Sequence, residues 1–133
     1  MVQVSALFTA LAMAASVAAE GCYTGGEPFG DALAAVKQHI YNMCHGYSGN
    51  RGALQDTWFK GYNESPYPAS VCVNLEPFNR RLNVEVTNQW NSGRTLSQQA
   101  CANNLIEMTG CLWGGIVTKN GFQFKVDPNQ GYC

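Results

Sequence analysis

GCLWGGIVTKNGFQFKVDPNQGYC, residues 110–133, predicts a β-hairpin around which the rest of the chain can be arranged. Residues 122–126 alternate apolar and polar side chains, which is typical of a strand with one buried face. Asn120-Gly121 predicts the turn, because a type I′ turn needs a positive φ at both central residues and these two residue types tolerate it. We expect the second strand to end at residues 127–129 (DPN), since proline has no N–H to donate to a neighbouring strand.

The first 19 residues predict a signal peptide. Residues 2–19 form an apolar, alanine-rich run that ends in small residues before Glu20, which suits a cleavage site. The alternative is a membrane anchor, but the run is shorter than the ~20 residues that a spanning helix needs. We therefore expect residues 1–19 to be removed and residues 20–133 to form a single domain that is secreted and extracellular.

Apolar periodicity predicts two helices. The first covers residues 31–44 and has Asp31 at its start, where a carboxylate is favourable. The second begins after an N-cap at Thr95 or Ser97, and we expect Gly110 to close it in a left-handed conformation. Both helices need an apolar surface against which to bury their stripes.

Two further strands supply that surface. Residues 70–75 and 81–88 alternate apolar and polar side chains, and a short strand is expected around Trp58. Together with the hairpin, these elements predict an α+β fold. It is an α/β sandwich with a mainly antiparallel sheet of about five strands, two helices packed on the sheet's apolar face, and disulfides that staple it.

All six cysteines lie between residues 22 and 133, and an even number behind a secretion signal predicts a disulfide framework. Cys72 falls between two apolar strand residues, so it should point to the polar face of the sheet, where the N-terminal arm can cross it. Among fifteen connectivities, the pattern favours the set Cys22–Cys72, Cys44–Cys101 between the helices, and Cys111–Cys133 around the hairpin. No spacing of cysteine and histidine suits zinc, so no metal site is expected.

The charges argue against several partners. The chain has a formal net charge of −1 and only 13% charged residues, and neither sign forms a run. A nucleic acid or an anionic membrane surface would need clustered lysine and arginine. We therefore expect no nucleic-acid partner and no stable membrane insertion. A surface built from amides and hydroxyls suits a neutral polar ligand, because no charge has to be buried.

Catalysis is not expected either. The sequence has no G-x-S-x-G, no H-E-x-x-H and no glycine-rich phosphate loop. A secreted ribonuclease would need histidine beside a carboxylate on the open sheet face, where Glu85 and Arg81 are expected. His39 and His45 belong to the first helix and its C-terminal end, which pack on the opposite face. A structural role at the helix end is therefore the simpler interpretation, and no cofactor is expected.

Aromatic and amide side chains gather in two predicted loops. Aromatic rings stack on the C–H faces of sugars, and amides pair with sugar hydroxyls. The residues that suit this chemistry are Trp58, Tyr62, Asn63 and Tyr67 in the first loop and Trp90, Asn91 and Arg94 in the second. The alternative is that both tryptophans are core or strand-end residues. Asn63 also begins the sequon Asn-Glu-Ser, which predicts N-glycosylation on a surface loop, although Pro66 follows it directly.

Several segments resemble a family of small, secreted, cysteine-rich fungal proteins that includes a mushroom glycan-binding lectin. They are CYTGGE at residues 22–27, CVNL at 72–75, LSQQAC at 96–101, GCLWGG at 110–115 and DPNQGYC at 127–133. The resemblance spans most of residues 20–133 and involves mainly cysteines, glycines and turn residues. It implies a small α/β sandwich, a homodimer joined through its sheets, and binding of a fucosylated GalNAc–GlcNAc glycan. It assigns no binding residue in this chain.

The sequence therefore predicts a secreted, non-enzymatic carbohydrate-binding protein with glycans or glycoproteins as partners. The first alternative is a secreted fungal effector or toxin-like protein that acts on a host or competitor protein or membrane. The second is a small secreted hydrolase, such as a ribonuclease that uses His39 or His45.

Overall fold

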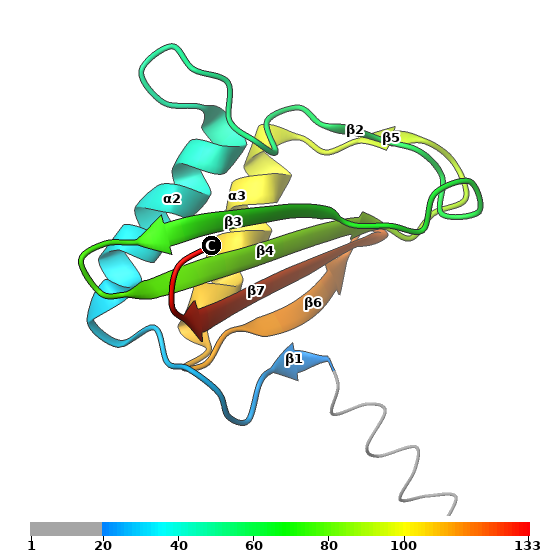
Figure 1. Ribbon diagram of the computed structural model, residues 1–133. Helices are drawn as coiled ribbons and strands as arrows, with labels where there is room; N and C mark the ends of the chain where they lie inside the picture. Colours follow the sequence, from blue (N-terminus) through cyan, green and yellow to red (C-terminus); the bar gives the residue numbers. More distant parts are fainter. Residues whose placement is uncertain (1–19) are drawn as a thin grey trace, which may run out of the picture.

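The computed structural model describes residues 20–133, so the signal peptide predicted over residues 1–19 lies outside the described residues. Both helices lie on one face of a five-stranded antiparallel sheet with strand order β1-β6-β7-β4-β3 (Figure 1). The elements are β1 (Gly21–Cys22), η1 (Gly30–Ala32), α2 (Leu33–His45), β2 (Trp58–Phe59), β3 (Ala69–Leu75), β4 (Arg80–Asn88), β5 (Arg94–Thr95), α3 (Gln98–Glu107), η2 (Met108–Gly110), β6 (Gly115–Lys119) and β7 (Phe122–Gln130). The predicted α+β sandwich is confirmed.

The predicted hairpin forms β6 and β7, and its turn has the expected conformation. Asn120 and Gly121 have φ values of 52° and 80°, so both central residues are left-handed. The second strand does not end where the sequence predicted, because β7 continues through Pro128 to Gln130. Beyond Val126, β7 pairs with β4 alone and is an edge strand, where proline is tolerated.

The core lies between the sheet and the helices, and alternation along the strands builds it as predicted. Every second residue of β4 and β7 faces the helices, and these side chains are almost completely buried. Apolar residues from one side of each helix cover them. The buried set includes Leu82, Val84, Val86, Phe122, Phe124 and Val126 from the sheet and Val36, Ile40, Cys101 and Leu105 from the helices.

The helix ends differ from the sequence prediction at one of three positions. Ser97 caps α3, since its Oγ accepts a hydrogen bond from the backbone N–H of Ala100 at 3.1 Å. Asp31 lies in the first turn of η1, which leads directly into α2, and its carboxylate accepts a hydrogen bond from Arg80 rather than capping the helix. Gly110 is not left-handed: it is the last residue of the 3₁₀ turn η2, which continues α3.

One disulfide was predicted correctly and two were paired wrongly. Cys44–Cys101 joins the two helices, as expected. The predicted Cys22–Cys72 and Cys111–Cys133 bridges do not form, and the structure has Cys22–Cys111 and Cys72–Cys133 instead. The two chain ends cause the difference. The N-terminal arm was expected at β3 but lies at β6, and the C-terminal tail was expected near Cys111 but reaches β3.

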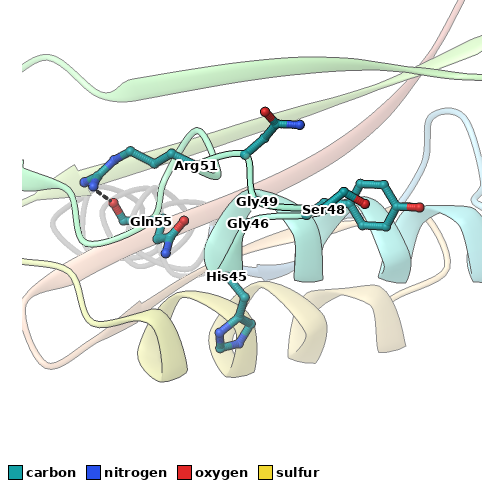
Figure 2. Close-up of a pocket in the computed structure, with 8 residues that line it drawn as sticks. His45, Gly46, Ser48, Gly49, Arg51 and Gln55 are labelled. Atoms are coloured by element: carbon teal, nitrogen blue, oxygen red, sulfur yellow. Dashed lines mark hydrogen bonds between the residues drawn. The ribbon is translucent and has the colours of Figure 1, made fainter.

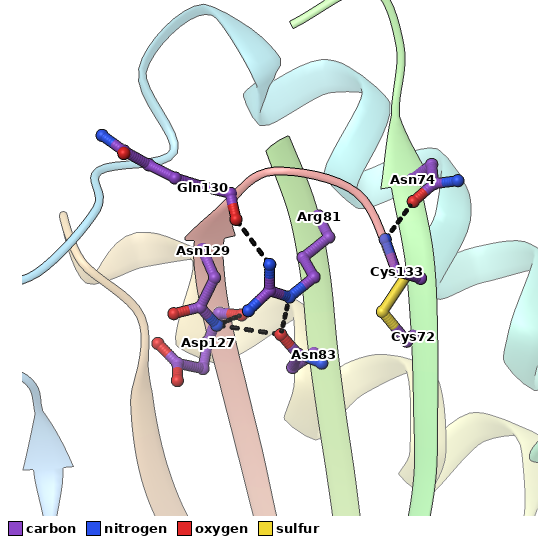
Figure 3. Close-up of a disulfide and its surroundings, with 8 residues drawn as sticks. All are labelled: Cys72, Asn74, Arg81, Asn83, Asp127, Asn129, Gln130 and Cys133. Atoms are coloured by element: carbon purple, nitrogen blue, oxygen red, sulfur yellow. Dashed lines mark hydrogen bonds between the residues drawn. A yellow bond between two sulfur atoms is a disulfide. The ribbon is translucent and has the colours of Figure 1, made fainter. Parts of the chain in front are cut away.

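The N-terminal arm does not cross the polar face of the sheet. It adds β1 to the edge of β6, where Gly21 pairs with Ile116, and this places Cys22 beside Cys111. The C-terminal tail instead leaves β7, passes over β4 and reaches Cys72 on β3 (Figure 3). Cys72 does lie on the polar face of β3, as the alternation predicted, and is exposed. The strand at Trp58 pairs with β5 in a separate two-stranded sheet.

Within residues 20–133, no helix is long and apolar enough to cross a membrane.

Candidate functional site

Three segments that are distant in sequence meet at one end of the sandwich, where β4 ends and β7 begins (Figure 1). The backbone N–H of Tyr62 donates to the carbonyl of Trp90 at 2.7 Å, and that of Gln89 donates to Gly121 at 2.8 Å. These bonds join the loop after β2, the loop between β4 and β5, and the β6–β7 turn. We call this surface the loop end, and it comprises residues 58–63, 88–95 and 119–122.

A buried asparagine holds the loop end together. Asn88 is only 2% exposed. Its Nδ2 donates to the carbonyls of Lys60 (3.1 Å) and Ser92 (2.9 Å), and its Oδ1 accepts from the backbone N–H of Trp90 (3.1 Å). Sequence reasoning missed this role, although a signal was present. Asn88 continues the inward-facing alternation of β4, so a polar residue stands where an apolar one is expected.

Trp90 lies against a glycine and beneath an arginine. A β-carbon added at Gly121 would overlap the indole nitrogen and neighbouring ring atoms. The Arg94 guanidinium carbon lies 4.1 Å from the centroid of the Trp90 ring and 5.2 Å from that of Phe122. Arg94 also donates a hydrogen bond from Nη1 to the carbonyl of Asn120. The ring and the cation therefore hold each other in place.

Trp58 is positioned in the same way. Its six-membered ring lies over Gly93, where an added β-carbon would overlap it. Trp58 nevertheless keeps 63% of its surface exposed, and Trp90 keeps 51%. Neither tryptophan is therefore a core residue, although Trp58 is a strand-end residue of β2, as the alternative also allowed. Two large rings are fixed on one side and open to solvent on the other.

Only some of the other predicted site residues lie close to the two tryptophans. Asn91 belongs to the loop end, since its carbonyl packs against Gly61 so closely that a β-carbon there would overlap it. Tyr62 is 45% exposed and is bonded through its backbone to Trp90. Tyr67 is largely exposed and makes no hydrogen bond or ring contact to the loop end among residues 20–133. Asn63 is exposed in the turn after Gly61, and use of its sequon stays a prediction.

A cavity of about 190 Å³ adjoins the loop end. Arg94 lies at its boundary with the Trp90 ring, because Arg94 lines the cavity and its guanidinium stacks on that ring. Sequence reasoning missed most of this cavity, since residues 119–120 were interpreted only as hairpin and turn. The lining residues are Arg94, Thr95, Ser97, Ala100, Asn104, Lys119, Asn120, Phe122 and Phe124.

A larger cavity of about 400 Å³ lies at the loop that follows α2 (Figure 2). Two of its polar side chains bond inside the loop: Arg51 Nη2 donates to the carbonyl of Gln55 (2.6 Å), and Gln55 Oε1 accepts from the N–H of Gly52 (2.9 Å). In Figure 2 the side chain of His45 points away from Arg51 and Gln55. Arg51, Gln55 and His45 therefore do not converge on one point in this cavity.

His45 is turned toward the helical layer. Gln98 Nε2 donates to Asp56 Oδ2 at 2.8 Å, which leaves Gln98 Oε1 to accept from His45 Nδ1 at 3.0 Å. The ring also packs on Tyr41, with 4.4 Å between the ring centroids. The hydrogen bond joins the C-terminal end of α2 to the first turn of α3, which is a structural role.

The outer face of the sheet is polar and is not covered by either helix. Arg81 Nε and Asn129 Nδ2 both donate to Asn83 Oδ1, at 3.2 and 2.9 Å, and Arg81 Nη1 donates to the carbonyl of Gln130 (Figure 3). Most of these groups therefore serve to bind the strands and the C-terminal tail to one another.

The pKa of Tyr23 is affected by burial and by charged groups of the outer face. Burial raises the pKa of Tyr23, and the carboxylates of Asp127 and Glu85 raise it further. Glu85 also pairs with Lys125, with 3.6 Å between Oε2 and Nζ. Charges of both signs are thus mixed on the outer face.

No protein-family model matches the chain. A search of curated proteins also finds no significantly similar sequence.

Proposed function

We propose that this protein is a secreted, non-enzymatic carbohydrate-binding protein whose ligand stacks on the tryptophans of the loop end. The observation that carries the proposal is the setting of Trp58 and Trp90, two exposed indole rings that each lie against a glycine. Large exposed aromatic rings bind the apolar faces of sugars, and neutral amides beside them bind the sugar hydroxyls.

The rigidity of the loop end supports this proposal. Binding is weakened when mobile side chains and loops must be ordered, by about 0.5–1.5 kcal/mol for each immobilised side chain. Here the glycines fix the rings, Arg94 stacks on Trp90, and Asn88 joins the loops through three hydrogen bonds. A ligand would therefore meet a surface that is already formed.

The separation of titratable groups supports the non-enzymatic part of the proposal. General acid–base catalysis needs a base within hydrogen-bond reach of the reacting group. His45 contacts Gln98 in the helical layer, whereas Arg81 and Glu85 lie on the outer face of the sheet. The ribonuclease alternative needs histidine beside Glu85 or Arg81 on the open sheet face, and the sheet stands between His45 and both of these residues.

Secretion and dimer formation belong to the same proposal. The three disulfides suit an oxidising compartment outside the cell. β3 pairs with β4 on one side only, so its seven-residue outer edge is available for pairing with a second copy of the chain. The family resemblance adds a homodimer of this kind and a fucosylated GalNAc–GlcNAc glycan as the first ligand to test.

A glycan array on the oxidised protein, expressed through a secretory pathway, tests the function. We expect binding that Trp58→Ala and Trp90→Ala each weaken by tenfold or more, roughly the effect of losing one stacked ring. Tyr47→Ala is the matched control, because Tyr47 is exposed to the same degree as Trp58 (64% and 63%) but lies in the loop after α2. Absence of any binding, or equal losses in all three variants, would refute the proposal.

A further inference from the structure

Arg94 is a fixed cation that has no acidic partner. Its guanidinium stacks on Trp90 and Phe122, and Nη1 donates to the carbonyl of Asn120. Among residues 20–133, none of its contacts is with a carboxylate. A guanidinium has five N–H donors in a planar fork, so one hydrogen bond leaves most of this fork without a protein acceptor.

The cavity beside Arg94 suits a small polar group. Ser97, Asn104 and Asn120 contribute hydroxyl and amide groups to its lining, whereas Phe122 and Phe124 line it from the core, with only 5% and 0% of their surface exposed. Polar groups rather than aromatic surface are therefore what the cavity presents to a ligand. Its volume of about 190 Å³ leaves room for a single small group rather than for a long chain.

The charge balance of the cavity is positive. Lys119 also lines it, and its Nζ lies 3.9 Å from Glu107 Oε1. Both side chains of this pair are about half exposed, at 46% and 51%, so the pair is weak and screened by salt. The chain as a whole has a net charge of −1, so this excess of positive charge is a local feature.

From these observations we infer that the cavity binds the anionic group of an acidic saccharide, either a carboxylate or a sulfate ester. The guanidinium of Arg94 forms paired hydrogen bonds to two oxygens of that group, while a neighbouring sugar contacts the ring of Trp90. Lys119 adds a longer-range attraction. The inference rests on the proposed function and names its ligand class, which differs from the neutral fucosylated glycan that the family resemblance implies.

A nucleic acid is the competing anionic ligand, and the chain argues against it. Binding along a phosphate backbone needs several clustered cations. Only eight lysines and arginines occur in the sequence. Of these, Arg80 and Arg81 serve the N-terminal arm and the outer face, away from the cavity. One fixed cation and one mobile cation suit a single anionic group on a sugar.

The test compares matched saccharides with and without the anionic group. A hexamer of galacturonic acid is titrated against its full methyl ester, and a sulfated neutral hexasaccharide against its desulfated parent, by isothermal titration calorimetry. We expect one of the acidic ligands to bind at least about tenfold more tightly than its neutral counterpart, because charge-assisted hydrogen bonds are lost with the charge. The difference should shrink as salt is raised from 0.05 M to 1 M.

Variants test whether the preference for acidic over neutral saccharides arises in the cavity. Lys119→Gln should weaken binding of the acidic ligand by about two- to fivefold and leave the neutral ligand unchanged. Lys125→Gln is the matched control, because Lys125 also pairs with an exposed glutamate, at 3.6 Å, but on the outer face. Arg94→Gln should abolish the preference, and near-ultraviolet circular dichroism checks that this variant keeps its fold.

The outcomes separate the two proposals. Equal affinity for acidic and neutral ligands, or equal effects of Lys119→Gln and Lys125→Gln, would overturn the acidic-ligand inference but leave saccharide binding intact. Failure to bind any saccharide would overturn both. Tighter binding of a single-stranded RNA hexamer than of either acidic saccharide would also overturn the inference, in favour of a nucleic-acid ligand.

Discussion

Replacing Gly121 by alanine should displace the ring of Trp90 and destabilise the fold. Two effects add at this position. Gly121 has a φ of 80°, a left-handed conformation that costs an L-residue about 1–2 kcal/mol. The new methyl group would also overlap the indole, so the ring must leave its place under Arg94 and lose a cation–π contact worth about 0.5–1 kcal/mol. The expected loss of unfolding free energy is therefore about 1.5–3 kcal/mol.

Two other glycines separate these effects. Gly49 has the same φ of 80° but nothing within 4 Å of an added β-carbon, so Gly49→Ala measures the backbone strain alone and should cost about 1–2 kcal/mol. Gly110 has neither a positive φ nor a close neighbour, so Gly110→Ala should be neutral or stabilise slightly, by up to about 1 kcal/mol.

Urea unfolding of the three oxidised variants, followed by circular dichroism, gives these free energies. Native-state tryptophan fluorescence gives the environment of the rings. The spectrum of Gly121→Ala should change, and the spectra of the Gly49 and Gly110 variants should match the parent. Equal free-energy losses for Gly121→Ala and Gly49→Ala, together with unchanged fluorescence, would show that the Trp90 ring is not held against Gly121.

Three further predictions follow from buried or linked groups. Asn88→Ala should lower the unfolding free energy by about 2–4 kcal/mol and weaken saccharide binding, because three backbone groups lose their partner; urea unfolding and the glycan array measure this. Cys44→Ala with Cys101→Ala removes a fully buried bridge between residues 57 apart and should cost about 4 kcal/mol in the same unfolding assay. Tyr23 keeps its proton more tightly in the folded state, so stability should decline as pH rises above its ordinary pKa of 10.0 and through the raised value; Tyr23→Phe should lack that part of the decline in pH-dependent unfolding.

The regular elements follow from the sequence because their signals are local. Alternation in residues 122–126 and the Asn120-Gly121 turn are properties of adjacent residues, and the structure has both. The disulfide pairing depends instead on where the chain ends dock. Nothing local to Cys22 indicates that the N-terminal arm adds to β6 rather than crossing the sheet. The position of the arm nevertheless determines that Cys22 pairs with Cys111 and not with Cys72.

The candidate site shows the same division. The exposed tryptophans were predicted from their loops, but the groups that hold them come from distant positions. Arg94 reaches the carbonyl of Asn120 across 26 residues, and Asn88 reaches that of Lys60 across 28. Such contacts depend on strand register, which is known only once the sheet is assembled. The Asn88 signal, a polar residue in an apolar alternation, was the one local indication.

The means of stabilisation differ between the two parts of the molecule. The disulfides fix the N-terminal arm, the C-terminal tail and the helix pair, all of which join the sheet through few or no strand pairs. The loop end instead depends on the hydrogen bonds of Asn88, on close glycine contacts and on the stacking of Arg94. A region held by hydrogen bonds and stacking opens locally at a lower free energy than a region held by a covalent bridge. Rigidity at the loop end should therefore be lost before global unfolding, and saccharide binding should fail at a lower temperature than the far-ultraviolet signal does.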